Sequence, residues 1–260
     1  MNNTIVLTRP IAQSQALAKQ LEALRYRVAI FPLLEIAALP ERSELQIKLQ
    51  TSLANLDRYA MAAFVSPNAI HAVFQQKTRW PAHVAIAVLG EGSRLALAQY
   101  GINDTNTRIY SPTDPLKSDS ETLLHNIDLP ALKGHEVVIF RAETGRELLA
   151  DALTEHEIKV DKVIAYRRFA ATLSEQSAQQ LMALLTESSR WVISSSEALR
   201  TLEDLVMQSA GEVGVVKMHQ VNLWVSHQRI AQFAEKSGFK HVHLIGLGDE
   251  NILLALQSHL

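Results

Sequence analysis

Short polar turns follow several of the strands that the sequence predicts, and their residue types suit anion binding. Each turn stands where an apolar run ends and a helical pattern begins. The first N–H groups of a helix have no partner within the helix, and with the helix dipole they bind carboxylate or phosphate. The candidate substrate-binding residues in these turns are Thr8, Arg9, Ser66, Asn68, Ser93, Arg141, Thr144, Gly145, Arg146, Ser194, Ser195, Ser196, Ser226 and His227.

Each turn taken alone also fits a simpler interpretation. A Ser or Asn before a helix is most often an ordinary N-cap, and an Arg beside a strand end is about as often part of a surface ion pair. The set carries more weight than its members, because two facing sheets would direct many such turns into one cleft. If backbone N–H groups carry the binding, the hydroxyls of Ser66 and Ser195 are expected to matter little.

Other chemistries lack their residues. His241 and His243 stand two apart on a predicted strand without carboxylate or thiolate partners in ligand spacing, so we expect no metal. The pairs Gly90/Gly92 and Gly246/Gly248 lack the third glycine and downstream acid of a dinucleotide site. There is no Gly-x-Ser-x-Gly elbow and no phosphate-binding loop, which argues against a nucleophilic hydrolase or an NTPase. The absence of cysteine excludes disulfides and thiolate chemistry.

The elements that position the turns come in two copies. Residues 136–166 predict a buried strand, a polar turn, an amphipathic helix and a second strand. At an offset of 132, Arg141, Leu149, Ala150, Leu153 and Val160 fall on Arg9, Leu17, Ala18, Leu21 and Val28 without a gap. At an offset of 129, Ser195, Ala198 and Leu199 fall on Ser66, Ala69 and Ile70. The sequence therefore predicts a duplicated unit.

Strands alternate with helices along the chain, which predicts parallel sheets with helices on both faces. In such folds ligands lie outside the carboxyl ends of the strands. With 260 residues, 47% of them hydrophobic, the chain favours two domains over one larger domain.

The net charge of -2 and a pI near 6.6 argue against a nucleic-acid binder. The sequence shows no apolar run near 18 residues, and its first residues lack a basic region followed by an apolar core. We therefore expect a protein of the cytoplasm without a nucleic-acid or membrane partner.

The order of several weak motifs along the chain indicates a protein family, which residue spacing alone does not. They are Leu7-Thr8-Arg9-Pro10, residues 31–36 (FPLLEI), residues 64–69 (FVSPNA), Leu89-Gly90-Glu91-Gly92-Ser93, the unit from Arg141 to Tyr166, residues 193–198 (ISSSEA) and residues 225–231 (VSHQRIA). In this order, over essentially the whole length, the chain resembles the uroporphyrinogen-III synthase family. Departures from the family pattern fall at residues 227–230, where many members have a Gly and hydroxyl residues, and at Arg168, where a Thr is common.

The resemblance implies an α/β fold of two doubly wound parallel-sheet domains joined by a two-stranded β ladder. Residues 1–35 and 170–260 would form the first domain and residues 40–162 the second. Residues 33–39 and 163–169 would be the linkers between the domains. The first strand-helix-strand piece would thus pack with the C-terminal half of the chain.

The resemblance also implies a cofactor-independent enzyme that closes the linear tetrapyrrole hydroxymethylbilane, inverts ring D and releases water. This substrate carries eight carboxylates, which suits a site of N–H groups and hydroxyls. Tyr166, expected to end a strand at the cleft, is the implied catalytic residue. The implied protein is a monomer, with a transient hand-over of the bilane from hydroxymethylbilane synthase.

Two functions of other classes remain open at this point. One is a two-lobed binding protein that closes on an anionic metabolite without chemistry, and the other is a two-domain sugar transferase. Turnover of hydroxymethylbilane separates the synthase from both, and a melting temperature shifted by a nucleotide sugar would favour the transferase.

Overall fold

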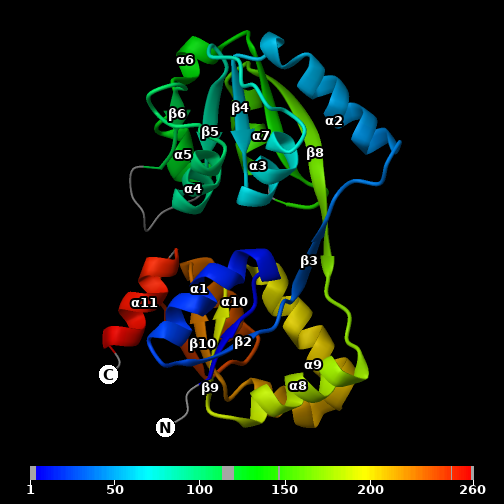
Figure 1. Cartoon of the computed structure of the whole chain (residues 1–260), viewed down its shortest axis with the longest axis vertical. Coiled ribbons are helices and arrows are strands. Elements are labelled where there is room, and N and C mark those ends of the chain that lie inside the picture. Colours follow the sequence, from blue (N-terminus) through cyan, green and yellow to red (C-terminus); the bar gives the residue numbers. More distant parts are fainter. Residues whose placement is uncertain (1–3, 113–119, 146, 247, 259–260) are drawn as a thin grey trace. The chain divides into compact units, whose positions relative to one another are not determined.

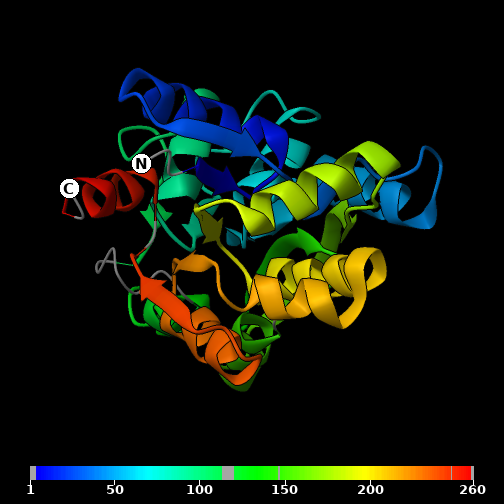
Figure 2. The same cartoon turned by 90° about the horizontal axis from the view of Figure 1, so that it is seen from below.

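The computed structural model describes residues 4–112, 120–145, 147–246 and 248–258. The chain separates into two compact units, one formed by Met1–Glu35 with Phe169–Leu260 and the other by Ile36–Arg168. Each unit is built on one sheet with helices on both faces, as Figure 1 and Figure 2 show from two directions. We call them the five-stranded unit and the six-stranded unit after their sheets.

The sheet of the five-stranded unit has the strand order β11-β10-β9-β1-β2, and all its neighbours are parallel. Its strands are β1 (Thr4–Leu7), β2 (Arg27–Ile30), β9 (Ser189–Ile193), β10 (Asn222–Val225) and β11 (His241–Leu244). Its helices are α1 (Ile11–Ala23), α8 (Glu175–Thr186), α9 (Ser196–Met218), α10 (Gln228–Lys236) and α11 (Asp249–Ser258).

The sheet of the six-stranded unit has the order β3-β8-β7-β4-β5-β6, and the pairs from β8 to β6 are parallel. Its strands are β3 (Leu34–Ala37), β4 (Met61–Phe64), β5 (Ala85–Val88), β6 (Ile109–Tyr110), β7 (Glu136–Ala142) and β8 (Lys159–Ala170). Its helices are α2 (Glu44–Ala54), α3 (Pro67–Phe74), α4 (Glu91–Gln99), α5 (Ser120–Leu124), α6 (Leu129–Leu132) and α7 (Leu148–Glu155), with the 3-10 turn η1 (Leu56–Arg58).

Alternating strand residues supply the two faces of each sheet. In β1, Val6 joins the core formed with α8, α9 and α10, whereas Ile5 and Leu7 join the core formed with α1 and α11. In β4, Phe64 packs with residues of α2, α3 and α4, whereas Ala63 packs with residues of α5 and α7. Burial on both faces explains why these strands read as continuous apolar runs.

The duplication predicted from the sequence is visible in the topology. The order β2-β1-β9-β10-β11 in one sheet matches β8-β7-β4-β5-β6 in the other. The offset of 132 carries β1 onto β7 and β2 onto the start of β8, and the offset of 129 carries β4 onto β9. The repeated Leu17, Leu21, Leu149 and Leu153 are all buried. The repeat therefore records equivalent positions in two similar folds.

One expectation about an element end was wrong. Tyr166 does not end its strand, because β8 runs on to Ala170 where it pairs with β3, and a register shift between Arg141 and Ala142 of β7 lies opposite this part of β8. Helix α9 has a kink at Gly211, whose φ of 56° suits glycine.

Candidate functional site

The parallel registers bring the ends of three strands of the six-stranded unit together. Phe64, the last residue of β4, lies opposite Phe140 of β7 and Val88 of β5. The turns that follow these strands contain Ser66 and Asn68, Ser93, and Thr144 and Gly145. These predicted residues therefore gather at one carboxyl edge, where ligands of α/β sheets bind.

The five-stranded unit has an equivalent edge. Leu7 of β1 lies opposite Val192 of β9, and Val225 of β10 lies opposite Ile193. The turns after these strands supply the second set of predicted residues, which is Thr8, Arg9, Ser194, Ser195, Ser196, Ser226 and His227.

Three of the predicted residues are N-caps of the helices at these edges. Ser66 Oγ accepts a hydrogen bond from the Ala69 N–H at 3.2 Å, and Ser195 Oγ accepts one from the Ala198 N–H at 3.1 Å. His227 Nδ1 accepts one from the Arg229 N–H at 3.1 Å. Asn68 and Ser196 lie in the first turns of α3 and α9. The simpler N-cap interpretation therefore holds for Ser66, Ser195 and His227, whether or not these turns also bind substrate.

Tyr166 is buried, with 2% of its surface exposed, and its ring belongs to the core beneath α2, α3 and α4. Its hydroxyl oxygen lies 3.0 Å from Ser66 Oγ. The structure thus joins the predicted catalytic residue to a predicted binding residue at the carboxyl edge of the six-stranded unit.

Both repeated arginines meet a carboxylate of their own unit. Arg9 Nη2 lies 2.6 Å from Asp249 Oδ1 at the start of α11, and Arg141 Nη1 lies 2.6 Å from Glu147 Oε1 at the start of α7. The side chain of Arg141 is only 8% exposed. Hydrogen bonds from Lys162 and Arg141 lower the pKa of Glu147. Each ion pair holds the Arg side chain and its turn in place, and the carboxylate neutralises the guanidinium charge. We call such an arginine braced.

The absence of a side chain at Gly145 leaves space for the guanidinium of Arg141. Its φ is +154°, and a Cβ atom at this position would lie 3.2 Å from Arg141 Nη2. Close approach of backbone to guanidinium therefore favours glycine here.

The remaining predicted residues have mixed surroundings. Thr8 is buried and its Oγ1 donates to the Val192 carbonyl at 2.6 Å, which ties β1 to β9. Ser93 is buried in the first turn of α4, Ser194 is exposed, and the Ser226 hydroxyl is enclosed by protein. Thr144 is exposed and accepts a 3.4 Å hydrogen bond from Arg168, a family departure. Arg146 lies outside the described residues.

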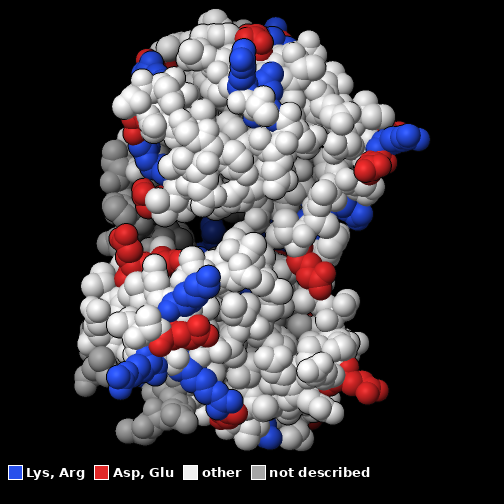
Figure 3. Space-filling view, viewed as in Figure 1, with Lys and Arg blue, Asp and Glu red and all other residues white. Residues whose placement is uncertain are grey.

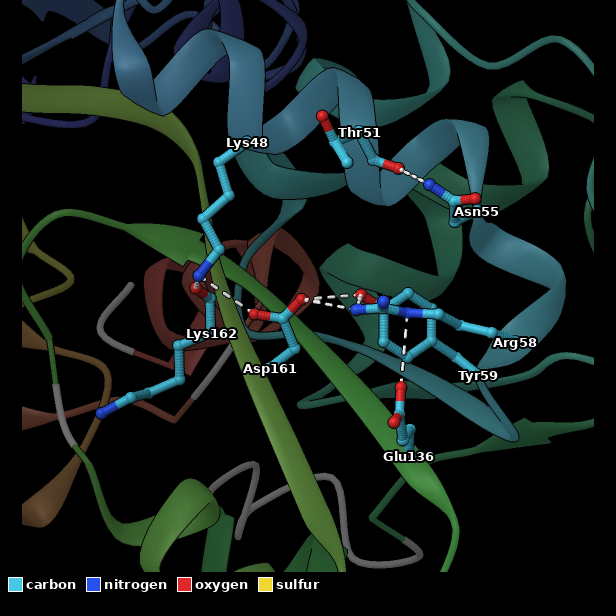
Figure 4. A network of polar contacts seen from close by, with 8 residues as sticks. All are labelled: Lys48, Thr51, Asn55, Arg58, Tyr59, Glu136, Asp161 and Lys162. Carbon is cyan, nitrogen blue, oxygen red and sulfur yellow. Dashed lines mark hydrogen bonds and ion pairs between the residues drawn. The ribbon is translucent and has the colours of Figure 1, made fainter.

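A second polar cluster lies at the opposite, amino edge of the six-stranded unit (Figure 4). Asp161 of β8 accepts from the Tyr59 hydroxyl at 2.7 Å and pairs with Lys48 of α2 at 3.0 Å and with Arg58 at 3.3 Å. Arg58 also pairs with Glu136 of β7 at 3.3 Å. This amino-edge network fastens α2 and the start of β7 to β8, the strand that carries Tyr166.

The network shifts the acidity of its members. Burial raises the pKa of Tyr59, and its hydrogen bond to Asp161 raises it further. Burial alone would raise the pKa of Asp161 as well, but hydrogen bonds from Tyr59 and Lys48 outweigh it, and the pKa of Asp161 is lowered. Asp161 is therefore held as a carboxylate.

Sequence reasoning missed the acids that brace the arginines. Glu147 stands six residues after Arg141 at a helix start, where acidic residues are favoured, so this pairing has a readable signal. The partner of Arg9 is Asp249, 240 residues away, and only the fold brings the two together.

Among the described residues, no cluster of three or more His, Asp or Glu side chains is placed to hold a metal ion. Within the same part of the chain, every helix is too short or too polar to cross a membrane.

The family model described as "Uroporphyrinogen-III synthase HemD" matches residues 15–244. A uroporphyrinogen-III synthase of Salmonella typhimurium is 30% identical over 257 residues, which span 98% of this chain and 100% of that protein. One of Escherichia coli is 28% identical with the same coverage.

Two solved structures share the fold of this chain. The uroporphyrinogen-III synthetase of Helicobacter pylori superposes with a TM-score of 0.58 at 14% identity, covering 98% of this chain and 99% of that one. A mutant uroporphyrinogen III synthase of Thermus thermophilus gives 0.57 at 12% identity, covering 99% and 98%. The fold and its polar edges define an α/β protein of two parallel-sheet units. By the family model and its relatives, the chain belongs to the uroporphyrinogen-III synthase family.

Proposed function

We propose that this protein cyclises hydroxymethylbilane to uroporphyrinogen III, with inversion of ring D and loss of water. The family match over residues 15–244 carries this proposal, together with relatives that align over their full length. It is a lyase of tetrapyrrole and heme biosynthesis that works without a cofactor. Neither the binding protein nor the sugar transferase has support of this kind.

The carboxyl edges of the two sheets are proposed to bind the substrate carboxylates. Helix first turns at Asn68 and Ser196, and the first turn of α4 ahead of Ser93, are proposed to present N–H donors to anions, in accordance with the helix dipole. The N–H of Ser93 itself donates to the Gly90 carbonyl at 3.0 Å. Arg9 and Arg141 are proposed to act mainly by holding their turns, since each already has a carboxylate partner. The other candidates are proposed to shape the same edges, with hydroxyls at Thr144, Ser194 and Ser226 and a side-chain cap at His227.

Tyr166 is proposed to assist departure of the substrate hydroxyl. As the C–O bond breaks, the phenol gives its proton to the leaving oxygen, which takes the bond's electron pair and departs as water. The final ring closure releases a proton from the attacking pyrrole carbon, and this proton restores the phenol. The hydrogen bond between Tyr166 and Ser66 at the carboxyl edge supports a fixed orientation for the phenol. Holding the bilane curled supplies most of the remaining acceleration.

The proposal is tested by incubating the purified protein with enzymically generated hydroxymethylbilane and separating the isomeric products by chromatography. The expected result is the type III isomer in proportion to enzyme. Spontaneous closure yields the type I isomer, so type I alone at the rate of a protein-free control would contradict the proposal.

A monomer that receives the bilane by transient hand-over from hydroxymethylbilane synthase is also proposed. Spontaneous closure to the wrong isomer supports a short transfer. Lys, Arg, Asp and Glu side chains are scattered among residues of other types on the surface drawn in Figure 3. Cytoplasmic location is proposed because a chain without cysteine suits a reducing compartment. Sedimentation of the protein alone tests whether it is a monomer, and sedimentation together with hydroxymethylbilane synthase tests whether the two enzymes associate.

A further inference from the structure

Ser66 makes two contacts through one oxygen. Its Oγ accepts the Ala69 N–H at 3.2 Å, which caps α3, and it lies 3.0 Å from the hydroxyl oxygen of Tyr166. Ser66 lies in the turn after β4, and Tyr166 lies in β8, 100 positions further along the chain. The contact therefore joins the first turn of α3 to the strand that carries the phenol.

The hydrogen-bond capacity of a serine hydroxyl constrains this arrangement. The hydroxyl has one proton to donate and two lone pairs to accept with, and the Ala69 N–H uses one lone pair. If Ser66 donates its proton to the Tyr166 oxygen, the phenol keeps its own proton for another acceptor. A hydrogen bond donated to this oxygen also stabilises the phenolate that proton transfer leaves behind.

The duplicated unit contains the same cap without the phenol. Ser195 caps α9 as Ser66 caps α3. The distance from Oγ to the capped backbone nitrogen is 3.1 Å at Ser195 and 3.2 Å at Ser66. At the offset of 132 the position of Tyr166 corresponds to Leu34, which has no hydroxyl. Capping alone therefore does not explain why Ser66 and Tyr166 meet.

We propose that Ser66 is a positioning residue for Tyr166. It donates a hydrogen bond to the phenol oxygen, fixes the direction of the phenol proton, and couples the phenol to the positive end of α3 through its cap bond. This inference rests on the proposed acid role of Tyr166 and deepens it. It also distinguishes Ser66 from Ser195, which the sequence treats alike.

The test measures kcat, KM and melting temperature for Ser66→Ala and for Ser43→Ala as the matched control, because Ser43 caps α2 of the same unit by accepting the Gln46 N–H at 3.2 Å. Both changes remove an N-cap, so both should lower the melting temperature alike. Ser66→Ala should lower kcat by about tenfold with little change in KM, since general acids contribute about 10²–10⁴-fold and only part of the effect is lost. Ser43→Ala should stay within about twofold, and Ser66→Thr, which keeps a hydroxyl, should restore most of kcat.

A double-mutant cycle identifies the route of the effect. If Ser66 acts through Tyr166, Ser66→Ala should cost nothing further in a Tyr166→Phe background. Should the alanine variants fail to fold, Ser66→Gly and Ser43→Gly replace them, because glycine is a tolerated N-cap. Equal kcat losses at Ser66 and Ser43, or additive losses in the double variant, would overturn the inference while leaving the acid role intact. Full activity of Tyr166→Phe would overturn both.

Discussion

The two sheets share a strand order, but the equivalent strands β2 and β8 differ in length. In the six-stranded unit β8 runs unbroken from Lys159 to Ala170. The stretch equivalent to it in the sequence is divided around Pro32 into β2, which belongs to the five-stranded sheet, and β3, which pairs with β8 in the six-stranded sheet. The unbroken strand brings Tyr166 beside the capped turn of α3, and the divided one has Leu34 at that position.

The two copies thus share backbone features and differ in side-chain contacts. The serine caps of α3 and α9 and the braced arginines recur in both units. The phenol and the amino-edge network occur in the six-stranded unit, where Asp161 corresponds to Ala29 of the other unit. Shared features fit anion binding at helix starts, and the unshared ones are where specific chemistry and local stability are to be sought.

Asp161→Asn should have the largest effect on stability. The change leaves the Tyr59 hydroxyl and the cations Lys48 and Arg58 without their shared carboxylate, at a cost of about 1–3 kcal/mol in unfolding free energy. Urea unfolding followed by circular dichroism measures it. Ala29→Ser, at the equivalent position, is the control and should cost less. A loss at Asp161 no larger than this control would show that the network contributes nothing.

The carboxylate of Asp161 also predicts that the difference in stability between wild type and Asp161→Asn depends on pH. A pKa lowered in the folded state means that the stabilisation is present above the ordinary value of 3.8 and is lost as pH falls through the lower folded value. Wild type should therefore lose its advantage over Asp161→Asn in that acid range. Parallel acid unfolding curves for the two proteins would contradict this.

Sequence patterns predicted the alternation of elements and the repeat because buried parallel strands and amphipathic helices follow local periodicity. They also located turns such as Ser66 and Ser195, whose N-cap signal is local. They did not predict the contact of Ser66 with Tyr166 or of Arg9 with Asp249, since such pairs depend on register and on where distant segments pack. The local pattern ended the strand at Tyr166 because the pairing of β8 with β3 is non-local, whereas the family resemblance implied a two-stranded ladder of residues 33–39 and 163–169.

Protonation should destabilise the six-stranded unit through His71. Its Nδ1 lies 3.1 Å from the Tyr100 hydroxyl between α3 and α4, and burial lowers its pKa from 6.5. The unfolded state then binds more protons, so stability falls as pH drops below about 6.5. The equivalent position of the other unit is Arg200, whose guanidinium stacks on Phe233. Melting temperatures between pH 7.5 and 5.5 should fall less in His71→Phe than in wild type and in the control His156→Gln. Equal slopes in all three would contradict the prediction.

We expect the smallest effect when the predicted second domain, residues 40–162, is expressed together with both predicted linkers and without the rest of the chain. Residues 34–170 are contiguous and contain the whole six-stranded sheet, so this segment expressed alone should fold cooperatively. Its circular dichroism and urea unfolding measure this. Residues 1–130, which lack β7 and β8, are the control and should not fold. A folded control with an unfolded 34–170 segment would refute the boundary.

The hydroxyl of Tyr166 is the side-chain group on which the proposed chemistry depends, and Tyr166→Phe tests it most directly because the ring is retained. Single-turnover conversion of hydroxymethylbilane to the type III product should slow by about tenfold to a hundredfold, at the low end of the range for general acids because this leaving group ionises readily. The melting temperature should change by only a few degrees, about what one lost hydrogen bond allows. Wild-type turnover in the Phe variant would contradict the account and leave the phenol a structural tie between β8 and α3.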